Sequence, residues 1–451
     1  MGEDDAFDIG ALAADHNVPG AAVGVLVGAD LHQEATGILN SGTGVAVTAE
    51  SLFQIGSITK LWTATLVMQL VGDGVLKLDA PVIEYISGFT TGADKQAATE
   101  ITIRQLLVHT SGISDDYTPT TRGDDAIQRY VTDVLPGLPT QFPPGQGFSY
   151  SNPGYVLLGC IAETVCEKTY SALLRERITE PLGIHQWAST PEEALLLRSA
   201  VGHVPTAGDS TLQPAPMWSM SAAHAPAGSQ VAMTAASLLR FASALMRGGQ
   251  PLVSEAILQQ MWTPHPGLAE MGGAGGQLAI GGVIQQAADT TVIAYDGATY
   301  GQSASLRILP EKNVAVVSLA NGGNMFGFHQ AVTSHFAAEA SGVALPTPPV
   351  PSSDPAPVEA AHVGGRYRGH DLEVEITPTS GGGVSVTEYP LTEELQALLP
   401  EGNPSEYVRL DDHRLIGLRT FAGVHPVITI SGEPPAPAPS VDHFGRVLHC
   451  I

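Results

Sequence analysis

The apolar positions near the start of the chain follow the pattern of strands. Residues 21–28 form a run of small apolar side chains, a turn at Ala29-Asp30 follows, and a second extended segment continues to about Gly37. Two β-prone runs joined by a short turn indicate a hairpin. The β-rich pattern returns late in the chain in three short segments, at 291–294, 303–309 and 314–319.

Between these strand-rich parts the apolar spacing is helical. From Ser57 to about Val71 apolar residues occupy most sides of the predicted helix, which is typical of a helix in a domain interior. Further helices are predicted at 101–108, 153–167, 232–247 and 326–341. The order of strands, helices and strands predicts a mixed α/β fold, an α+β sandwich in which helices flank an antiparallel sheet and an all-helical lobe is inserted.

The C-terminal part of the chain differs in composition. Residues 345–360 are rich in proline and predict a semi-rigid linker. Residues 361–451 contain short β-rich runs between turn residues and predict a small β-barrel or sandwich. We therefore predict one large domain at 1–344, the linker, and a small β-domain at 361–451.

Net charge and the lack of targeting signals restrict the expected partners and location of the protein. The formal charge is −25, with 45 acidic against 20 basic residues, so nucleic acid and anionic membranes are poor partners. Three cysteines do not suggest a disulfide framework. The start of the chain has no basic and apolar leader pattern, and no apolar stretch is long enough to span a bilayer. If this is the native start, we expect a cytoplasmic protein.

The first candidate motif is Ser57-Ile58-Thr59-Lys60. Residues three apart share one face of a helix, so the hydroxyl of Ser57 and the amine of Lys60 can meet. A serine hydroxyl needs a base, and a lysine can act as one where burial and a helix N-terminus lower its pKa. Taken alone, this spacing is also typical of an ordinary solvated helix start.

The second candidate motif is Tyr150-Ser151-Asn152, in a Pro/Gly-rich loop that leads into a predicted helix. A tyrosine hydroxyl beside a lysine can relay a proton to a leaving group. Asn152 points the same way and can hydrogen-bond Lys60 and a substrate amide. Taken alone, the segment also fits a capped helix start. No metal-binding spacing or phosphate-binding loop is evident, so no metal or cofactor is predicted.

Together the two motifs resemble those of the penicillin-recognising serine enzymes, which include class C β-lactamases, D-alanyl-D-alanine carboxypeptidases and related esterases. The segment 106–112, Leu-Leu-Val-His-Thr-Ser-Gly, is similar to a recurrent segment of that family. The resemblance covers roughly residues 10–345. It implies that Ser57 is the nucleophile, Lys60 the base and Tyr150 the proton shuttle, with Asn152 orienting Lys60 and the substrate.

The resemblance also implies a third motif on a late strand, where Tyr295-Asp296-Gly297 aligns with a Lys/His-x-Gly pattern. Gly297 would let the substrate approach the strand. The backbone N–H groups of Ser57 and Ala298 would form the oxyanion hole. Position 295 departs from the pattern, because tyrosine offers no positive charge to a substrate carboxylate at neutral pH.

Four other residues near these motifs are assigned by default to ordinary roles. Arg307 on the neighbouring strand could supply the missing charge, although an ordinary strand-surface arginine is the stronger interpretation. His109 is expected to be structural, because the family base is the lysine. Asp115 and Asp116 could lie near the rim of the cleft, with a solvated loop as the default.

The resemblance predicts a serine hydrolase or acyltransferase that acts on ester, thioester or peptide substrates through an acyl-enzyme on Ser57. One alternative is a stand-alone thioesterase of the penicillin-binding-protein type, which macrocyclises a nonribosomal peptide delivered as a carrier-bound peptidyl thioester. Enzymes of that branch resemble this chain in carrying a small lipocalin-like β-domain after the catalytic domain. A true β-lactamase or D,D-peptidase is another alternative, and a non-catalytic sensor is disfavoured by the intact motifs. The sequence gives no oligomeric state.

Overall fold

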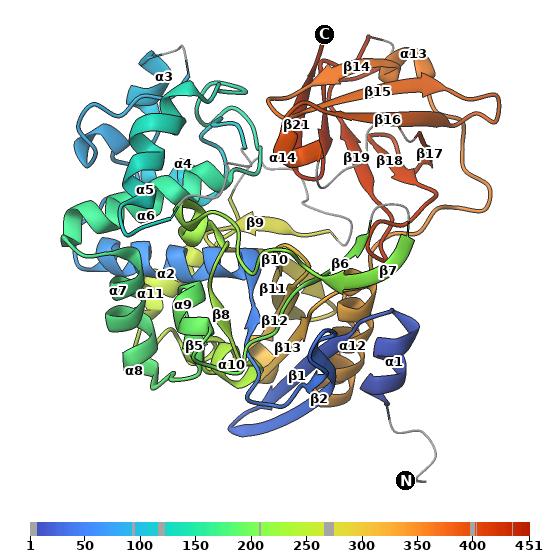
Figure 1. Cartoon of the computed structure of the whole chain (residues 1–451). Helices are drawn as coiled ribbons and strands as arrows, with labels where there is room; N and C mark the ends of the chain where they lie inside the picture. Colours follow the sequence, from blue (N-terminus) through green and yellow to red (C-terminus); the bar gives the residue numbers. More distant parts are fainter. Residues whose placement is uncertain are drawn as a thin grey trace.

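The computed structural model describes residues 7–92, 95–115, 122–206, 209–265, 275–396, 402, 404–434 and 436–451. Within these residues, the larger domain is built on an antiparallel sheet of eight strands in the order β3-β2-β1-β13-β12-β11-β10-β9 (Figure 1). Its strands are β1 (Gly20–Val27), β2 (Asp30–Asn40), β3 (Val45–Ala46), β9 (Gln277–Ala279), β10 (Gly282–Ala287), β11 (Thr290–Ala298), β12 (Ser303–Leu309) and β13 (Val314–Ala320).

Both faces of the sheet are covered, which explains why its central strands are apolar at nearly every position. On β1, Val23 and Val25 belong to the cluster formed with α1 (Ile9–Asp15) and α12 (Met325–Ser341). Gly24, between them, faces α10 (Ala235–Met246), where an added Cβ would lie 2.7 Å from a methyl of Leu239. Alternate residues of a strand point to opposite faces, so each face requires its own apolar set.

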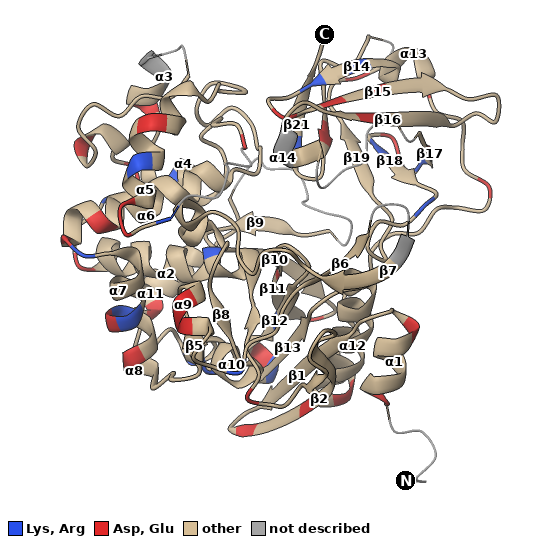
Figure 2. Cartoon of the chain, in the orientation of Figure 1, with Lys and Arg blue, Asp and Glu red and all other residues tan. Residues whose placement is uncertain are grey.

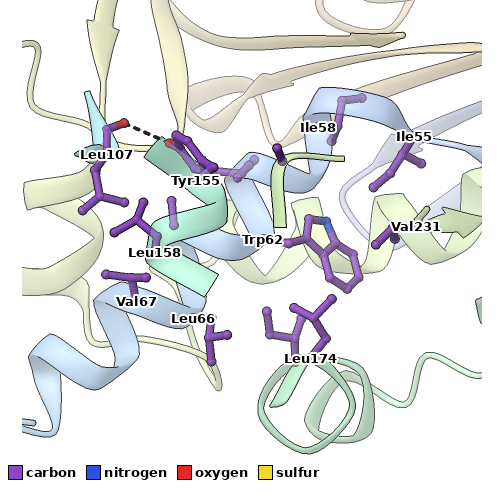
Figure 3. Close-up of a cluster of buried hydrophobic side chains, with 14 of the residues drawn as sticks. Ile55, Ile58, Trp62, Leu66, Val67, Leu107, Tyr155, Leu158, Leu174 and Val231 are labelled. Carbon is purple, nitrogen blue, oxygen red and sulfur yellow. Dashed lines mark hydrogen bonds between the residues drawn. The ribbon is translucent and has the colours of Figure 1, made fainter. Parts of the chain in front are cut away.

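The helix α2 (Thr59–Gly72) lies in the interior, as its all-round apolar pattern predicts. Its Trp62 ring stacks on Phe241 of α10 with centroids 4.6 Å apart. Figure 3 shows Trp62 among the surrounding apolar side chains, and it also shows the Tyr155 hydroxyl, which donates to the Leu107 carbonyl at 2.9 Å. Among the described residues, no helix is both long and apolar enough to cross a membrane.

The inserted lobe and its neighbouring segments consist of helices, a small three-stranded sheet and one strand pair beside α2. Two of its helices begin at side-chain caps that the sequence contains: Thr102 forms a capping box with Gln105, and Ser151 accepts from the Gly154 N–H. The lobe and its neighbouring segments include α3 (Lys95–Glu100), α4 (Ile103–Leu107), α5 (Ala126–Arg129), α6 (Asn152–Cys166), α7 (Tyr170–Leu174), α8 (Glu180–Leu182), α9 (Pro191–Ala194), α11 (Glu255–Met261), β4 (Phe53–Gln54), β5 (Trp187–Ala188), β6 (His203–Thr206), β7 (Asp209–Pro214) and β8 (Ala232–Met233).

The C-terminal part is a closed antiparallel barrel, in agreement with the predicted fold class. After α12 ends at Ser341, the next element is α13 (Ala360–Val363). Apolar side chains from its strands fill a core of its own. The barrel comprises β14 (Gly365–Arg368), β15 (Leu372–Pro378), β16 (Val384–Pro390), β17 (Ser405–Arg409), β18 (Arg414–Gly417), β19 (Val427–Ile430), β20 (Ser440–His443) and β21 (Arg446–Cys450), with α14 (Glu393–Gln396) after β16.

The barrel lies against the larger domain at two places. One loop docks on the start of α12, where the Phe326 N–H donates to the Ala422 carbonyl at 3.1 Å. The β20–β21 hairpin docks on the loop before α6, where the Tyr150 N–H donates to the Gly445 carbonyl at 2.8 Å. Acidic side chains are spread over both domains (Figure 2), so the net negative charge is not confined to one surface.

Candidate active site

The two sequence motifs meet at Ser57. Ser57 lies in the 3₁₀ turn η1 (Gly56–Ile58), which runs directly into α2. The Lys60 Nζ lies 3.1 Å from the Ser57 Oγ, one turn along, and the Tyr150 hydroxyl donates to the same Oγ at 2.8 Å. A single oxygen therefore contacts both an amine and a phenol that are potential proton carriers.

Lys60 is fully buried. Its Nζ also donates to the Ala227 carbonyl at 2.6 Å, which fixes its position beside Ser57. Burial is the main cause that lowers the pKa of Lys60 to about 7; Asp115 acts against this shift, and Arg446 adds to it. At neutral pH a large share of Lys60 is therefore unprotonated and able to accept a proton from Ser57.

His109 packs against the ring of Tyr150. Their rings stack with centroids 4.5 Å apart, and the His109 Nδ1 accepts from the Ser151 N–H at 3.1 Å. Burial, followed by the charges of Lys60 and Arg446, holds the pKa of His109 well below its ordinary value. These are the contacts of a neutral structural residue, as the sequence interpretation expects.

Two glycines bring the start of α2 against β11. A Cβ on Gly297 would lie 2.1 Å from the Ile55 carbonyl oxygen and 2.7 Å from the Ser57 backbone nitrogen. A Cβ on Gly56, which has a φ of +51°, would lie 2.4 Å from the Ala298 backbone nitrogen. Only residues without a Cβ allow this approach, which places the two predicted oxyanion amides on facing segments.

Asn152 lies elsewhere than predicted. It is the first residue of α6, and its side-chain amide is directed to Asp115, 3.4 Å from the Oδ2, instead of to Lys60. Its backbone N–H donates to the Asp115 Oδ1 at 2.8 Å. The default assignment of Asp115 to a solvated loop is wrong, because its side chain is 2% exposed. Asp116 lies outside the described residues.

Arg446, from the first position of β21, reaches the site from the barrel and was missed by the sequence analysis. Its Nε lies 2.7 Å from the Asp115 Oδ2, and its guanidinium is 5.4 Å from the centre of the Tyr150 ring. Arg446 and Asp115 are 331 positions apart, and no local pattern links them.

Among the described residues on the strand side of the site, no unpaired cation lies at the third motif. Burial, with the charge and hydrogen bond of Tyr150, raises the pKa of Tyr295 well above its ordinary value, so its hydroxyl is neutral. Arg307 binds both carboxylate oxygens of Asp296, at 2.7 and 3.0 Å. It therefore does not stand in for the missing charge.

A cavity of about 330 Å³ adjoins these residues. It is lined from the larger domain by Tyr150 and Tyr295 and from the barrel by Val424 and His425. Across the described part of the chain, no group of three or more His, Cys, Asp or Glu side chains is placed to hold a metal ion.

An antiparallel sheet flanked by helices, with a serine and a lysine one turn apart and a tyrosine on the serine oxygen, defines the class of penicillin-recognising serine enzymes. The chain belongs to the β-lactamase family, whose model, described as Beta-lactamase, matches residues 8–338.

The similar proteins differ in how much of this chain they cover. The chain is 38% identical over 367 residues to penicillin-binding protein 4 of Amycolatopsis lactamdurans, covering 79% of this chain and 95% of that protein. The crystal structure of SurE matches with a TM-score of 0.75 and 26% identity over 98% of each chain. A D-amino acid amidase from Ochrobactrum anthropi SV3, complexed with L-phenylalanine amide, matches with a TM-score of 0.58 and 25% identity over 70% of this chain and 90% of that one.

Proposed function

We propose that this protein is a serine hydrolase or acyltransferase that forms an acyl-enzyme on Ser57. The observation that carries the proposal is the buried Lys60 amine, 3.1 Å from the Ser57 Oγ with its pKa lowered to about 7. A fully charged lysine would only bind an anion, whereas a lysine that is partly neutral at pH 7 and lies at this distance can act as the base.

In the acylation step, Lys60 accepts the hydroxyl proton as the Ser57 Oγ attacks the substrate carbonyl carbon. The developing oxyanion lies between the N–H groups of Ser57 and Ala298. The bond to the leaving group then breaks, and Tyr150, hydrogen-bonded to the Ser57 Oγ at 2.8 Å, relays a proton from Lys60 to the departing atom. Attack by water or by an amine on the resulting ester releases the acid or the new amide and regenerates Ser57.

Within this reaction class, the site favours ester, thioester or peptide substrates whose recognition does not depend on a free carboxylate. A β-lactamase or D,D-peptidase is less well supported, because Tyr295 is neutral and Arg307 is already paired with Asp296.

The alternative of a macrocyclising thioesterase is supported by the docked barrel and by the likeness to SurE over 98% of both chains. The structure of SurE with D-Leu suggests a substrate that contains a D-configured residue. A peptidyl thioester containing such a residue is therefore the substrate we would test first.

Mass spectrometry after treatment with a fluorophosphonate or a penicillin tests the mechanism. One adduct is expected on Ser57 in the wild type and none in Ser57→Ala. Activity that persists while no adduct forms would overturn the mechanism. Incubation with the peptidyl thioester then separates cyclase from hydrolase, because a cyclase yields cyclic product and a hydrolase yields the linear acid.

A further inference from the structure

The β20–β21 hairpin of the barrel is hydrogen-bonded to the segment that carries Tyr150. The Tyr150 N–H donates to the Gly445 carbonyl at 2.8 Å, and the Val447 N–H donates to the Ser149 Oγ at 3.3 Å. The side chain between these two contacts is Arg446. The hairpin therefore fixes the backbone on which one of the three central side chains is mounted.

Arg446 adds a second connection between the hairpin and this segment, through the buried carboxylate of Asp115. Asp115 is 2% exposed and Arg446 is 20% exposed, so their ion pair is largely shielded from water. One oxygen of Asp115 accepts from the Arg446 Nε at 2.7 Å, while the other accepts from the Asn152 backbone N–H at 2.8 Å. A single carboxylate thus connects the barrel to the first residue of α6, two positions after Tyr150.

We propose that Arg446 and Asp115 are positioning residues for acylation, so that the docked barrel completes the active site of the larger domain. This inference rests on the proposed acyl-enzyme at Ser57. The pair acts through Tyr150, whose ring lies under the guanidinium, and through the electrostatic balance around Lys60.

The groups that face Lys60 come from every element packed around it. Ser57 lies in the turn η1 that runs into α2, and Tyr150 and His109 come from the loops before α6 and after α4. The Tyr155 ring of α6 lies 5.7 Å from the Nζ.

Asp115 and Arg446 are the carboxylate and the guanidinium that act on Lys60, and they do so with opposite sign. Tyr295 of β11 faces Tyr150 and is neutral. Loss of either charge alone therefore exposes Lys60 to the uncompensated charge of the other.

The experiment measures the rate of Ser57 acylation by a fluorophosphonate against pH in intact full-length variants. At low pH the rate profile has a limb on which protonation of Lys60 slows acylation. Arg446→Gln leaves the charge of Asp115 uncompensated, which raises the pKa of Lys60, so this limb should move to higher pH. Asp115→Asn removes the carboxylate and keeps the positive charge of Arg446, which lowers the pKa of Lys60, so the same limb should move to lower pH. Each single variant should also acylate about tenfold to a hundredfold more slowly, because Tyr150 loses its fixed geometry.

Two further variants make the test specific. The double variant Asp115→Asn/Arg446→Gln removes both charges and should return the limb to near the wild-type pH. Arg446→Lys keeps the charge but not the planar fork, so it should slow acylation without moving the limb. Arg409→Gln is the matched control, because Arg409 also lies in the barrel but pairs with Asp412, whose side chain is 83% exposed.

The outcomes separate this inference from the proposed function. An adduct on wild-type Ser57 together with unchanged rates and limbs in the Arg446 and Asp115 variants would overturn the inference alone. The inference would also be overturned if the low-pH limb moved in the same direction in both single variants. A general loss of folding would not produce shifts in opposite directions. Absence of any wild-type adduct would overturn both. Thermal melting of each variant identifies those that fail to fold, and Arg446→Lys then carries the test.

Discussion

The two walls of the cleft around Ser57 differ in how completely they are built. On the helical wall, Lys60 and Tyr150 each contact the Ser57 Oγ directly, and Asp115 and Arg446 brace the loop that carries Tyr150. On the strand wall, β11 presents a neutral Tyr295, and the nearby cation is already paired with Asp296. The helical wall is equipped to move protons, whereas the strand wall defines the substrate mainly by backbone and shape.

The two walls should also respond differently to substitution. Proton transfer needs fixed distances and a tuned pKa, so the residues of the helical wall depend on one another. In the proposed function, substrate anchoring depends on few side chains on the edge of β11, and Tyr295 among them reaches the proton carriers through its hydrogen bond with Tyr150. Side-chain variants on the helical wall should therefore remove activity, whereas variants of the strand-wall side chain Tyr295 should redirect it.

The largest expected effect is on the helical wall. Lys60→Ala removes the base and should slow acylation of Ser57 by about a hundredfold to ten-thousandfold. The rate of adduct formation by mass spectrometry measures this. Lys168→Ala is a suitable control, since Lys168 forms an exposed pair with Glu176. Wild-type rates in Lys60→Ala would assign the base to another group.

Gly297→Ala tests the backbone of the strand wall. The new Cβ would lie 2.1 Å from the Ile55 carbonyl oxygen, so β11 and the start of α2 must move apart. Separation of the Ser57 and Ala298 amides should lower the acylation rate by about a hundredfold or more. Gly137→Ala is the matched control, because nothing lies within 4 Å of its added Cβ. Equal rates in the two variants would exclude these amides as the oxyanion hole.

The pH dependence follows from the pKa of Lys60, which is lowered to about 7. Below that pH the amine is protonated and cannot accept the Ser57 proton, so the acylation rate should fall about tenfold per pH unit. A rate that is flat from pH 8 to pH 5 would contradict the assignment of Lys60 as the base.

Stability should follow the same pKa. Between about pH 7 and 10.5 the unfolded chain holds a proton on Lys60 that the folded chain lacks. The free energy of unfolding should therefore rise with pH in this window, by at most about 1.4 kcal/mol per pH unit. Denaturant unfolding of the wild type and of Lys60→Met, compared across this window, measures the slope. The slope should be smaller in the variant, and equal slopes would show that Lys60 does not cause it.

Features determined by nearby residues were predicted well from the sequence. The hairpin at β1 and β2, the interior helix α2 and the Ser57–Lys60 pair all depend on periodicity or on residues within one helical turn. The barrel was predicted because its alternation of apolar residues and turns is also local. The third motif was correctly placed on a late strand. The predicted strand ended at residue 294, whereas β11 continues to Ala298, which pairs with Ser303.

Features set by packing between distant segments were not predicted. Asn152 was assigned to Lys60 because the family spacing implies it, but its amide turns to Asp115 once that side chain is buried nearby. Asp115 was assigned to a solvated loop by default, with a place near the cleft rim as the other possibility. Its partner, Arg446, is brought to it only when the barrel docks, and a docking geometry leaves no periodic pattern in the sequence.

The smallest expected effect concerns the side chain that makes the strand wall unusual. Tyr295→His should raise turnover of substrates with a free carboxylate or a polarised carbonyl, because a protonated imidazole restores a positive charge at the third motif. A single partly solvated charge contributes at most about 1 kcal/mol, so the increase should be about fivefold or less. Tyr295→Phe is the matched control, since it keeps the ring without a charge. The ratio of the two variants' turnover should be larger at pH 6 than at pH 8, and dividing one by the other cancels the titration of Lys60. A ratio that stays at one across this range would remove position 295 from substrate binding and leave the strand wall to act through its backbone alone.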